Sequence, residues 1–116
     1  MSGSEKQSDG EKALLSVIGL CRGAGRAVIG VDMICEALKK RGIRPQSNDV
    51  IVIEACDTSE NTHKRISDRC EYYKARHIRI ESDCNALGRA VGKSAVGAVM
   101  INDANFCRAI DKKLTN

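Results

Sequence analysis

The sequence predicts an α/β fold, a three-layer α/β/α sandwich around a central mixed, mostly parallel sheet of about four strands. Helical and strand patterns alternate along the chain, and such alternation produces crossover connections with helices on both faces of a sheet. The run Val50–Ile53 is entirely β-branched, as expected for a strand covered on both faces. Only 3% of the 116 residues are aromatic, so the core must be built from aliphatic side chains and cysteine.

The first helix follows a polar tail. Residues 1–10 are rich in Ser and Gly and lack periodicity, so we expect a disordered tail there and one folded domain over residues 11–116. The helix is predicted to end near Arg22. Its apolar residues recur at helical spacing: Leu14, Val17, Ile18 and Cys21.

A glycine-marked turn leads into a second helix. Gly23 and Gly25 suit a turn, and residues 27–29 form a very short predicted strand. The second helix is expected over residues 31–41, ended by Gly42. Its free N-terminal N–H groups would suit an anion such as phosphate, although an ordinary surface helix explains the same charged residues. Its apolar face is Val31, Ile34, Cys35 and Leu38.

The central part of the chain predicts a loop, a buried strand and a third helix. Pro45 marks the loop, and Val50–Ile53 is the buried strand. Thr58 and Ser59 are alternative N-caps for the third helix. The predicted buried side of that helix carries Ile66, Cys70 and Tyr73.

The C-terminal part predicts two more strands and two more helices. Alternating apolar residues indicate a half-exposed strand over residues 77–80. Ser82 or Asp83 can cap a fourth helix, residues 96–101 read as another strand, and Asp103 can cap a final helix.

Charge and hydropathy restrict the partners only loosely. The net charge of +4, from 19 basic and 15 acidic residues, tolerates a polyanionic partner without requiring one. The sequence shows no signal peptide and no apolar run near the roughly 20 residues of a membrane span. We therefore expect a cytoplasmic protein with no membrane partner, and a monomer.

The cysteine pattern predicts neither a metal site nor a redox pair. The six cysteines are widely spaced, with no CxxC motif and no Cys/His cluster. They are interpreted as small buried hydrophobic residues of a reducing cytosol, with a disulfide framework as the alternative. No metal or cofactor is expected. The cysteines are Cys21, Cys35, Cys56, Cys70, Cys84 and Cys107.

An enzymatic function is not predicted. The glycine-rich stretch Gly23–Gly30 has neither Walker spacing nor a strand-led G-x-G-x-x-G pattern, because a helix precedes it. His63 and His77 have no matched nucleophile and acid, and Asp57 and Glu60 resemble helix-start caps more than an acid/base pair.

Several motifs, in their order along the chain, resemble those of one known family. They are Leu20–Arg26, Gly30 at the start of the second helix, Ala55–Thr62 and Leu87–Lys93. Together they resemble the L-seven-Ae family of ribosomal and kink-turn RNA-binding proteins. The stretch Asp57–Tyr73 is most similar to the small bacterial YlxQ-like members.

The resemblance covers nearly all of residues 11–114 and implies a ribosomal L-thirty-e-like fold. It also implies a non-enzymatic module that binds a sharply bent RNA, the kink-turn. In such proteins the start of the second helix reaches base edges at sheared G·A pairs, and the loop after the fourth helix covers bulged nucleotides. Transferred by position, the helix group is Gly30, Val31, Asp32, Met33 and Glu36, and the loop group is Gly92, Lys93, Ser94 and Ala95.

Basic residues are expected to surround this site and to hold phosphates, which positions an RNA without specifying its sequence. Basic residues spread over any soluble domain are the plainer explanation. The residues concerned are Arg22, Arg26, Lys39, Lys40, Arg89 and Lys93.

The second helix departs from the family pattern at three positions. Archaeal and eukaryotic members carry Asn, Glu and Lys where this chain has Asp32, Met33 and Glu36. An ionised Asp only accepts hydrogen bonds, and Glu36 places a carboxylate where a lysine would meet a guanine edge. A protein-interaction module that has lost kink-turn recognition is therefore the alternative.

Overall fold

The computed structural model describes residues 9–44 and 49–115. The helices are α1 (Asp9–Gly23), α2 (Val31–Arg41), α3 (Glu60–Tyr73), α4 (Cys84–Ala90) and α5 (Ala104–Thr115). The strands are β1 (Ala27–Ile29), β2 (Ile51–Glu54), β3 (Arg76–Arg79) and β4 (Ala98–Ile101). No helix among the described residues is long and apolar enough to cross a bilayer.

The expected order of elements is confirmed, with shifts at some ends. Helix α1 begins at Asp9, so the last two residues of the expected tail are helical. The rest of that tail and the loop expected at Pro45 lie outside the described residues. Strand β2 extends one residue further than the apolar run, to Glu54.

The sheet is mixed and four-stranded, as expected, in the order β1-β4-β2-β3. Its pairings are mostly antiparallel rather than parallel, however: β2 pairs parallel with β3, whereas β4 pairs antiparallel with both β1 and β2. Three strands thus share one direction, as crossover connections through α2 and α3 require, and β4 alone runs the other way.

The reversal of β4 follows from where the preceding connection, residues 80–97, begins and ends. Arg79 at the end of β3 is in register with Glu54, which is also in register with Ala98 at the start of β4. The segment containing α4 therefore leaves one end of the sheet and returns to the same end. A connection that does not traverse the sheet delivers an antiparallel strand.

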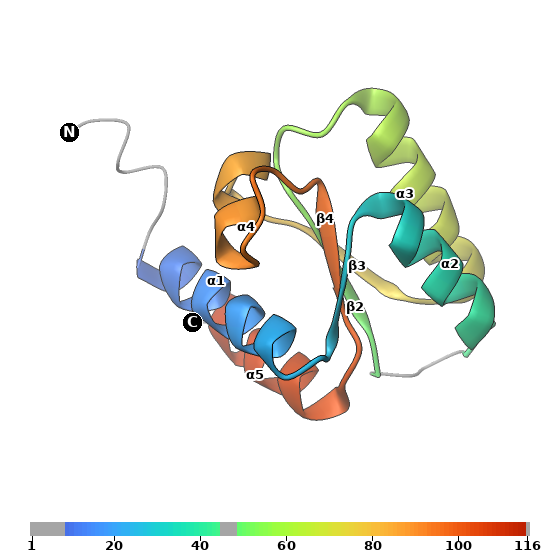
Figure 1. The fold of residues 1–116 in the computed structure, drawn as a ribbon. Coiled ribbons are helices and arrows are strands. Elements are labelled where there is room, and N and C mark those ends of the chain that lie inside the picture. Colours follow the sequence, from blue (N-terminus) through green and yellow to red (C-terminus); the bar gives the residue numbers. More distant parts are fainter. Residues whose placement is uncertain (1–8, 45–48, 116) are drawn as a thin grey trace.

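Helices cover both faces of the sheet, with α1, α4 and α5 on one face and α2 and α3 on the other (Figure 1). Alternate strand residues therefore enter different cores. The core under α1, α4 and α5 takes from β2 and β4 the side chains of Ile51, Ile53, Val99 and Ile101. The core under α2 and α3 takes those of Val52, Ala98 and Met100. All buried hydrophobic residues in the described chain are aliphatic or Cys, as the composition predicted, except Met100.

The structure decides between the alternative helix caps. The Ser59 hydroxyl accepts the N–H of Thr62 at 3.1 Å, and the Asp83 carboxylate accepts the N–H of Ala86 at 2.8 Å. Asp103 caps α5 as predicted. Ser82 is instead buried and donates both its N–H and its hydroxyl to Glu11.

The cysteine interpretation is confirmed for four of the six residues. Cys21, Cys35, Cys70 and Cys107 are buried and all six thiols are free, which removes the disulfide alternative. Cys84 is partly exposed. Cys56 contradicts the expectation, because it lies just after β2 with its side chain exposed.

Candidate nucleic-acid interface

The start of α2 presents unsatisfied backbone donors. Gly30 precedes the helix with φ of 95°, a conformation that glycine adopts without strain. Its N–H donates to the carbonyl of Ala98 at 3.0 Å, which ties the helix start to the first residue of β4. No side chain caps this N-terminus. The first-turn N–H groups and the positive end of the helix dipole therefore remain available to an anion.

The loop between α4 and β4 is held against α4. The N–H of Lys93 donates to the carbonyl of Gly88 at 2.8 Å, and the N–H of Val96 donates to that of Cys84 at 3.0 Å. A Cβ atom at Gly88 would lie only 2.7 Å from the Cα of Ala95. The loop backbone thus lies directly on the helix, and it leaves residues 92–95 exposed.

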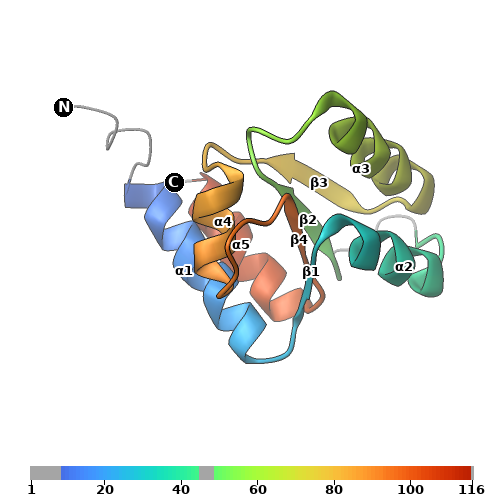
Figure 2. The ribbon, with the colours of Figure 1, turned by 45° about the horizontal axis from the view of Figure 1, so that its top comes forward.

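The start of α2 and the end of this loop lie side by side (Figure 2). A Cβ atom at Gly97 would lie 3.8 Å from a methyl group of Val31 and 3.4 Å from that of Thr58. Three segments distant in sequence therefore meet at one edge of the sheet: the start of α2, the loop before β4, and the loop between β2 and α3.

Two of the predicted basic residues lie at the loop before β4, and a third lies on α4. The Arg22 guanidinium lies 4.0 Å from the Cβ position of Gly92, and Lys93 is exposed in the same loop. Arg89, on α4, lines a groove between α1 and α4 together with Gly19.

Three other predicted basic residues are not brought to the start of α2. Arg26 lies at the opposite end of β1 and forms an ion pair with Asp103 at 3.7 Å. Lys39 and Lys40 lie in the last turn of α2, about 12 Å along the helix axis from Val31. The expected ring of positive charge is therefore incomplete at the helix start.

The three departures from the family pattern are all exposed on α2. The side chain of Met33 is 60% exposed. The Asp32 carboxylate is paired with the Arg65 guanidinium of α3 at 2.7 Å. Sequence reasoning missed Arg65, because periodicity places it on the polar side of its helix but does not show which residue of α2 it faces.

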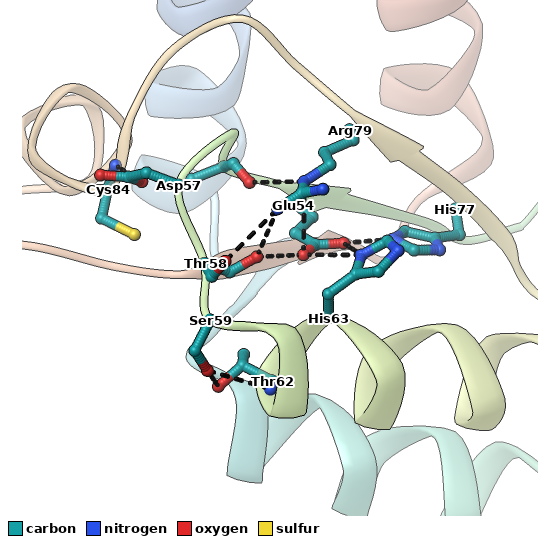
Figure 3. Close-up of polar contacts among 10 residues, drawn as sticks. Glu54, Asp57, Thr58, Ser59, Thr62, His63, His77, Arg79 and Cys84 are labelled. Carbon is teal, nitrogen blue, oxygen red and sulfur yellow. Dashed lines mark hydrogen bonds and ion pairs between the residues drawn. The ribbon is translucent and has the colours of Figure 1, made fainter.

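A second polar cluster lies where β2 and β3 end, on the face covered by α3 (Figure 3). Glu54 is fully buried, and its Oε1 lies 2.8 Å from Nδ1 of His63 and 2.7 Å from Nε2 of His77. The hydroxyl of Thr58 donates to Oε2. Arg79 stands on the same side, with its Nε 3.7 Å from Oε2.

These contacts explain how a carboxylate can be buried here. Burial raises the pKa of Glu54, but the hydrogen bonds from Thr58, His63 and His77 outweigh it and leave that pKa below its ordinary value. Sequence reasoning treated both histidines as isolated. The only sequence feature that could have indicated this cluster was a glutamate directly after a fully apolar strand.

Asp57 has a local structural role close to this cluster. Its carboxylate accepts the N–H of Cys84, the first residue of α4, at 2.8 Å. The hydrogen bonds from Cys84 lower the pKa of Asp57. Asp57 is thus a helix-start acceptor, as expected, but for α4 rather than for the adjacent α3.

One curated relative decides the family. The chain is 30% identical over 94 residues to the RNA-binding protein YlxQ of Bacillus subtilis, an alignment that covers 81% of this chain and 87% of that protein. The chain belongs to the YlxQ family. No protein-family model matches it.

Two solved structures show that the YlxQ family fold of this chain also occurs in more distant proteins. A protein of unknown function from Bacillus halodurans is 24% identical, with a TM-score of 0.75, over 89% of this chain and 97% of that one. A 15.5 kD RNA-binding protein of Giardia lamblia is 18% identical, with a TM-score of 0.69, over 94% of this chain and 90% of that one. These likenesses confirm the fold class.

Proposed function

We propose that this protein binds structured RNA, of the kink-turn or ribosomal kind, without catalysing a reaction. The observation that carries the proposal is the close approach of Gly97, which follows the exposed residues 92–95 in the loop before β4, to Val31 at the uncapped start of α2. The names of YlxQ and of the Giardia protein support RNA as the ligand. Two of the motifs that resemble the L-seven-Ae family reach these segments, namely Gly30 and Leu87–Lys93. We further infer a cytoplasmic monomer.

The geometry suits a mixture of backbone and side-chain contacts. First-turn N–H groups of α2 would donate to a phosphate or to an acceptor on a base edge. The small residues Gly92, Ser94 and Ala95 would let extruded nucleotides approach the loop backbone closely. Arg22 and Lys93 would hold neighbouring phosphates.

Arg65 gives the acidic start of α2 a balancing charge. Because its guanidinium pairs with Asp32, the carboxylate does not face an RNA phosphate alone. Arg65 is itself partly exposed, and a guanidinium has more donors than one carboxylate takes up. We propose it as an additional RNA contact. Glu36 remains an unfavourable charge for RNA at this surface.

The second candidate function is a protein-interaction module. The exposed Met33, which lies between Asp32 and Glu36 in the sequence, favours it. A flexible apolar side chain flanked by acidic groups suits a basic or apolar protein surface better than it suits a base edge.

The decisive experiment is a titration of the reduced protein against a labelled kink-turn RNA and a matched RNA without the sheared G·A pairs, at low and near-physiological salt. We expect preference for the kink-turn at both salt concentrations. Equal, salt-sensitive binding to both RNAs would indicate general phosphate contact. Absence of binding to either would contradict the proposal and favour the protein-interaction function.

A further inference from the structure

The residues of the cluster around Glu54 are not among those that we propose to contact RNA. The cluster's three members come from different elements: Glu54 from β2, His63 from α3 and His77 from β3. One carboxylate oxygen and one imidazole nitrogen from each ring lie within 4.8 Å of one another. Both rings point toward the same carboxylate oxygen (Figure 3).

We propose that Glu54, His63 and His77 form a binding site for a zinc-class transition-metal ion. Two imidazoles and one carboxylate are a donor set that zinc accepts, whereas calcium and magnesium prefer oxygen ligands alone. Three protein ligands leave the fourth tetrahedral position for a water molecule. The ion would take the place of the ring protons that the two histidines now direct at Oε1.

The carboxylate is oriented for this role by contacts on its other oxygen. Thr58 donates to Oε2 and Arg79 approaches Oε2 at 3.7 Å. Both histidines approach Oε1 closely, and Nδ1 of His63 also lies 3.0 Å from Oε2. Outer contacts of this kind hold a metal ligand in position.

The cluster has a route to solvent on one side. The side chains of Glu54 and His77 are 0% and 16% exposed, whereas that of His63 is 41% exposed. An ion would therefore enter past His63. A bound ion would link α3 to strands β2 and β3 close to Thr58. The methyl group of Thr58 lies next to Gly97.

A hydrogen-bonded cluster without any ion is the competing explanation, and zinc affinity separates the two. The test is a titration of the reduced, chelator-treated protein with zinc chloride at neutral pH, followed by calorimetry and by competition with a chromophoric chelator. We expect one zinc ion per chain. We expect His63→Ala and His77→Ala each to weaken binding by at least about tenfold, a loss that even an outer-shell change can cause at a metal site.

Two control variants exclude other ligands. Cys56→Ser removes the exposed thiol, and Glu71→Ala removes an exposed carboxylate elsewhere on α3. Both should bind zinc as the unaltered protein does. Zinc should also raise the Tm of the unaltered protein and of both controls, and not that of the histidine variants.

The histidine variants are first checked for folding by circular dichroism without metal. If His77→Ala fails to fold, His63→Ala carries the test, because His63 is partly exposed and its loss leaves no buried cavity. The cobalt spectrum of the unaltered protein is a second measure, expected to show tetrahedral nitrogen and oxygen ligation without a thiolate band. No binding, binding unaffected by His63→Ala, or a thiolate band would each overturn the proposal.

Discussion

At the scale of single residues, the six thiols differ sharply in their surroundings. Burial raises the pKa of Cys21 to about 11 and that of Cys70 to about 12. Burial, with the carboxylate of Asp57 nearby, raises the pKa of Cys84 to about 12. Cys56 is the exposed thiol of the set. Since the thiolate is the nucleophile, exposure and pKa together decide which cysteine reacts.

We therefore predict that iodoacetamide modifies Cys56 well before any other cysteine of the folded protein. Peptide mapping by mass spectrometry after brief treatment measures this selectivity. The denatured protein is the control, in which all six thiols should react. Modification of Cys70 at a rate close to that of Cys56 in the native state would contradict the burial described here.

The helix caps, which depend on neighbouring residues, were predictable from the sequence. Contacts between residues that are distant along the chain were not. The caps at Ser59 and Asp83 follow from polar side chains placed just before a helix, which requires only neighbouring sequence. Glu54, His63 and His77 are separated by 9 and 14 positions along the chain. Only the parallel register of β2 with β3, together with the packing of α3 on both, brings them together.

At the scale of elements, the loop before β4 depends on a close approach to α4. A side chain at Gly88 would meet the Ala95 backbone at 2.7 Å, and backbone atoms cannot rotate away. We predict that Gly88→Ala destabilises the protein by about 1–3 kcal/mol through overpacking. Urea unfolding monitored by circular dichroism measures the change.

Gly23→Ala is the matched control for this prediction. Gly23 ends α1 without a positive φ, and a Cβ atom there would have no neighbour within 4 Å. The same substitution should leave stability unchanged or raise it by up to about 1 kcal/mol. Equal destabilisation by both variants would show that the contact between the loop and α4 is not the cause.

The helices were predictable because each carries an apolar stripe and a recognisable end, as α2 does between Gly30 and Gly42. The direction of β4 was not. Alternating patterns indicate a crossover between parallel strands, and nothing in the local sequence of residues 96–101 shows on which side of the sheet the preceding connection ends. The connection of residues 80–97 begins and ends at the same end of the sheet, and only the assembled sheet shows this.

At the scale of the whole molecule, the proposed RNA surface occupies one edge of the sheet, and charge on that edge should matter most. We predict that Lys93→Gln weakens RNA binding and lowers the slope of log affinity against log salt by about 0.7–0.9, the contribution of one phosphate contact. Fluorescence anisotropy over a range of salt concentrations measures both effects.

Lys12→Gln removes the same charge from an exposed position in the first part of α1. It should leave affinity and slope nearly unchanged. If both variants weaken binding equally, RNA responds to net charge rather than to this edge. If neither does, the contact surface lies elsewhere on the protein.

The meeting of the two segments that carry the proposed surface was predictable in part. The family resemblance indicated the start of α2 and the loop after α4, and the structure brings these two segments together through Val31 and Gly97. The arrangement of charge around them was not predictable, because Lys39 and Arg26 are near the site in sequence but lie at the far ends of their elements. The pairing of Arg65 with Asp32 was not predictable either, because it depends on how α3 packs against α2.

The place of β4 in the sheet sets an order of events during synthesis. β4 is the last strand to be made, yet it lies between β1 and β2 and is the neighbour through which β1 joins the sheet. β1 therefore cannot pair within the sheet until nearly the whole chain has been synthesised. Contacts between sequence-distant strands slow folding and prolong the exposure of unpaired edges. A nascent chain released before residue 98 would lack the central strand of its own sheet and would be a substrate for chaperones or proteases.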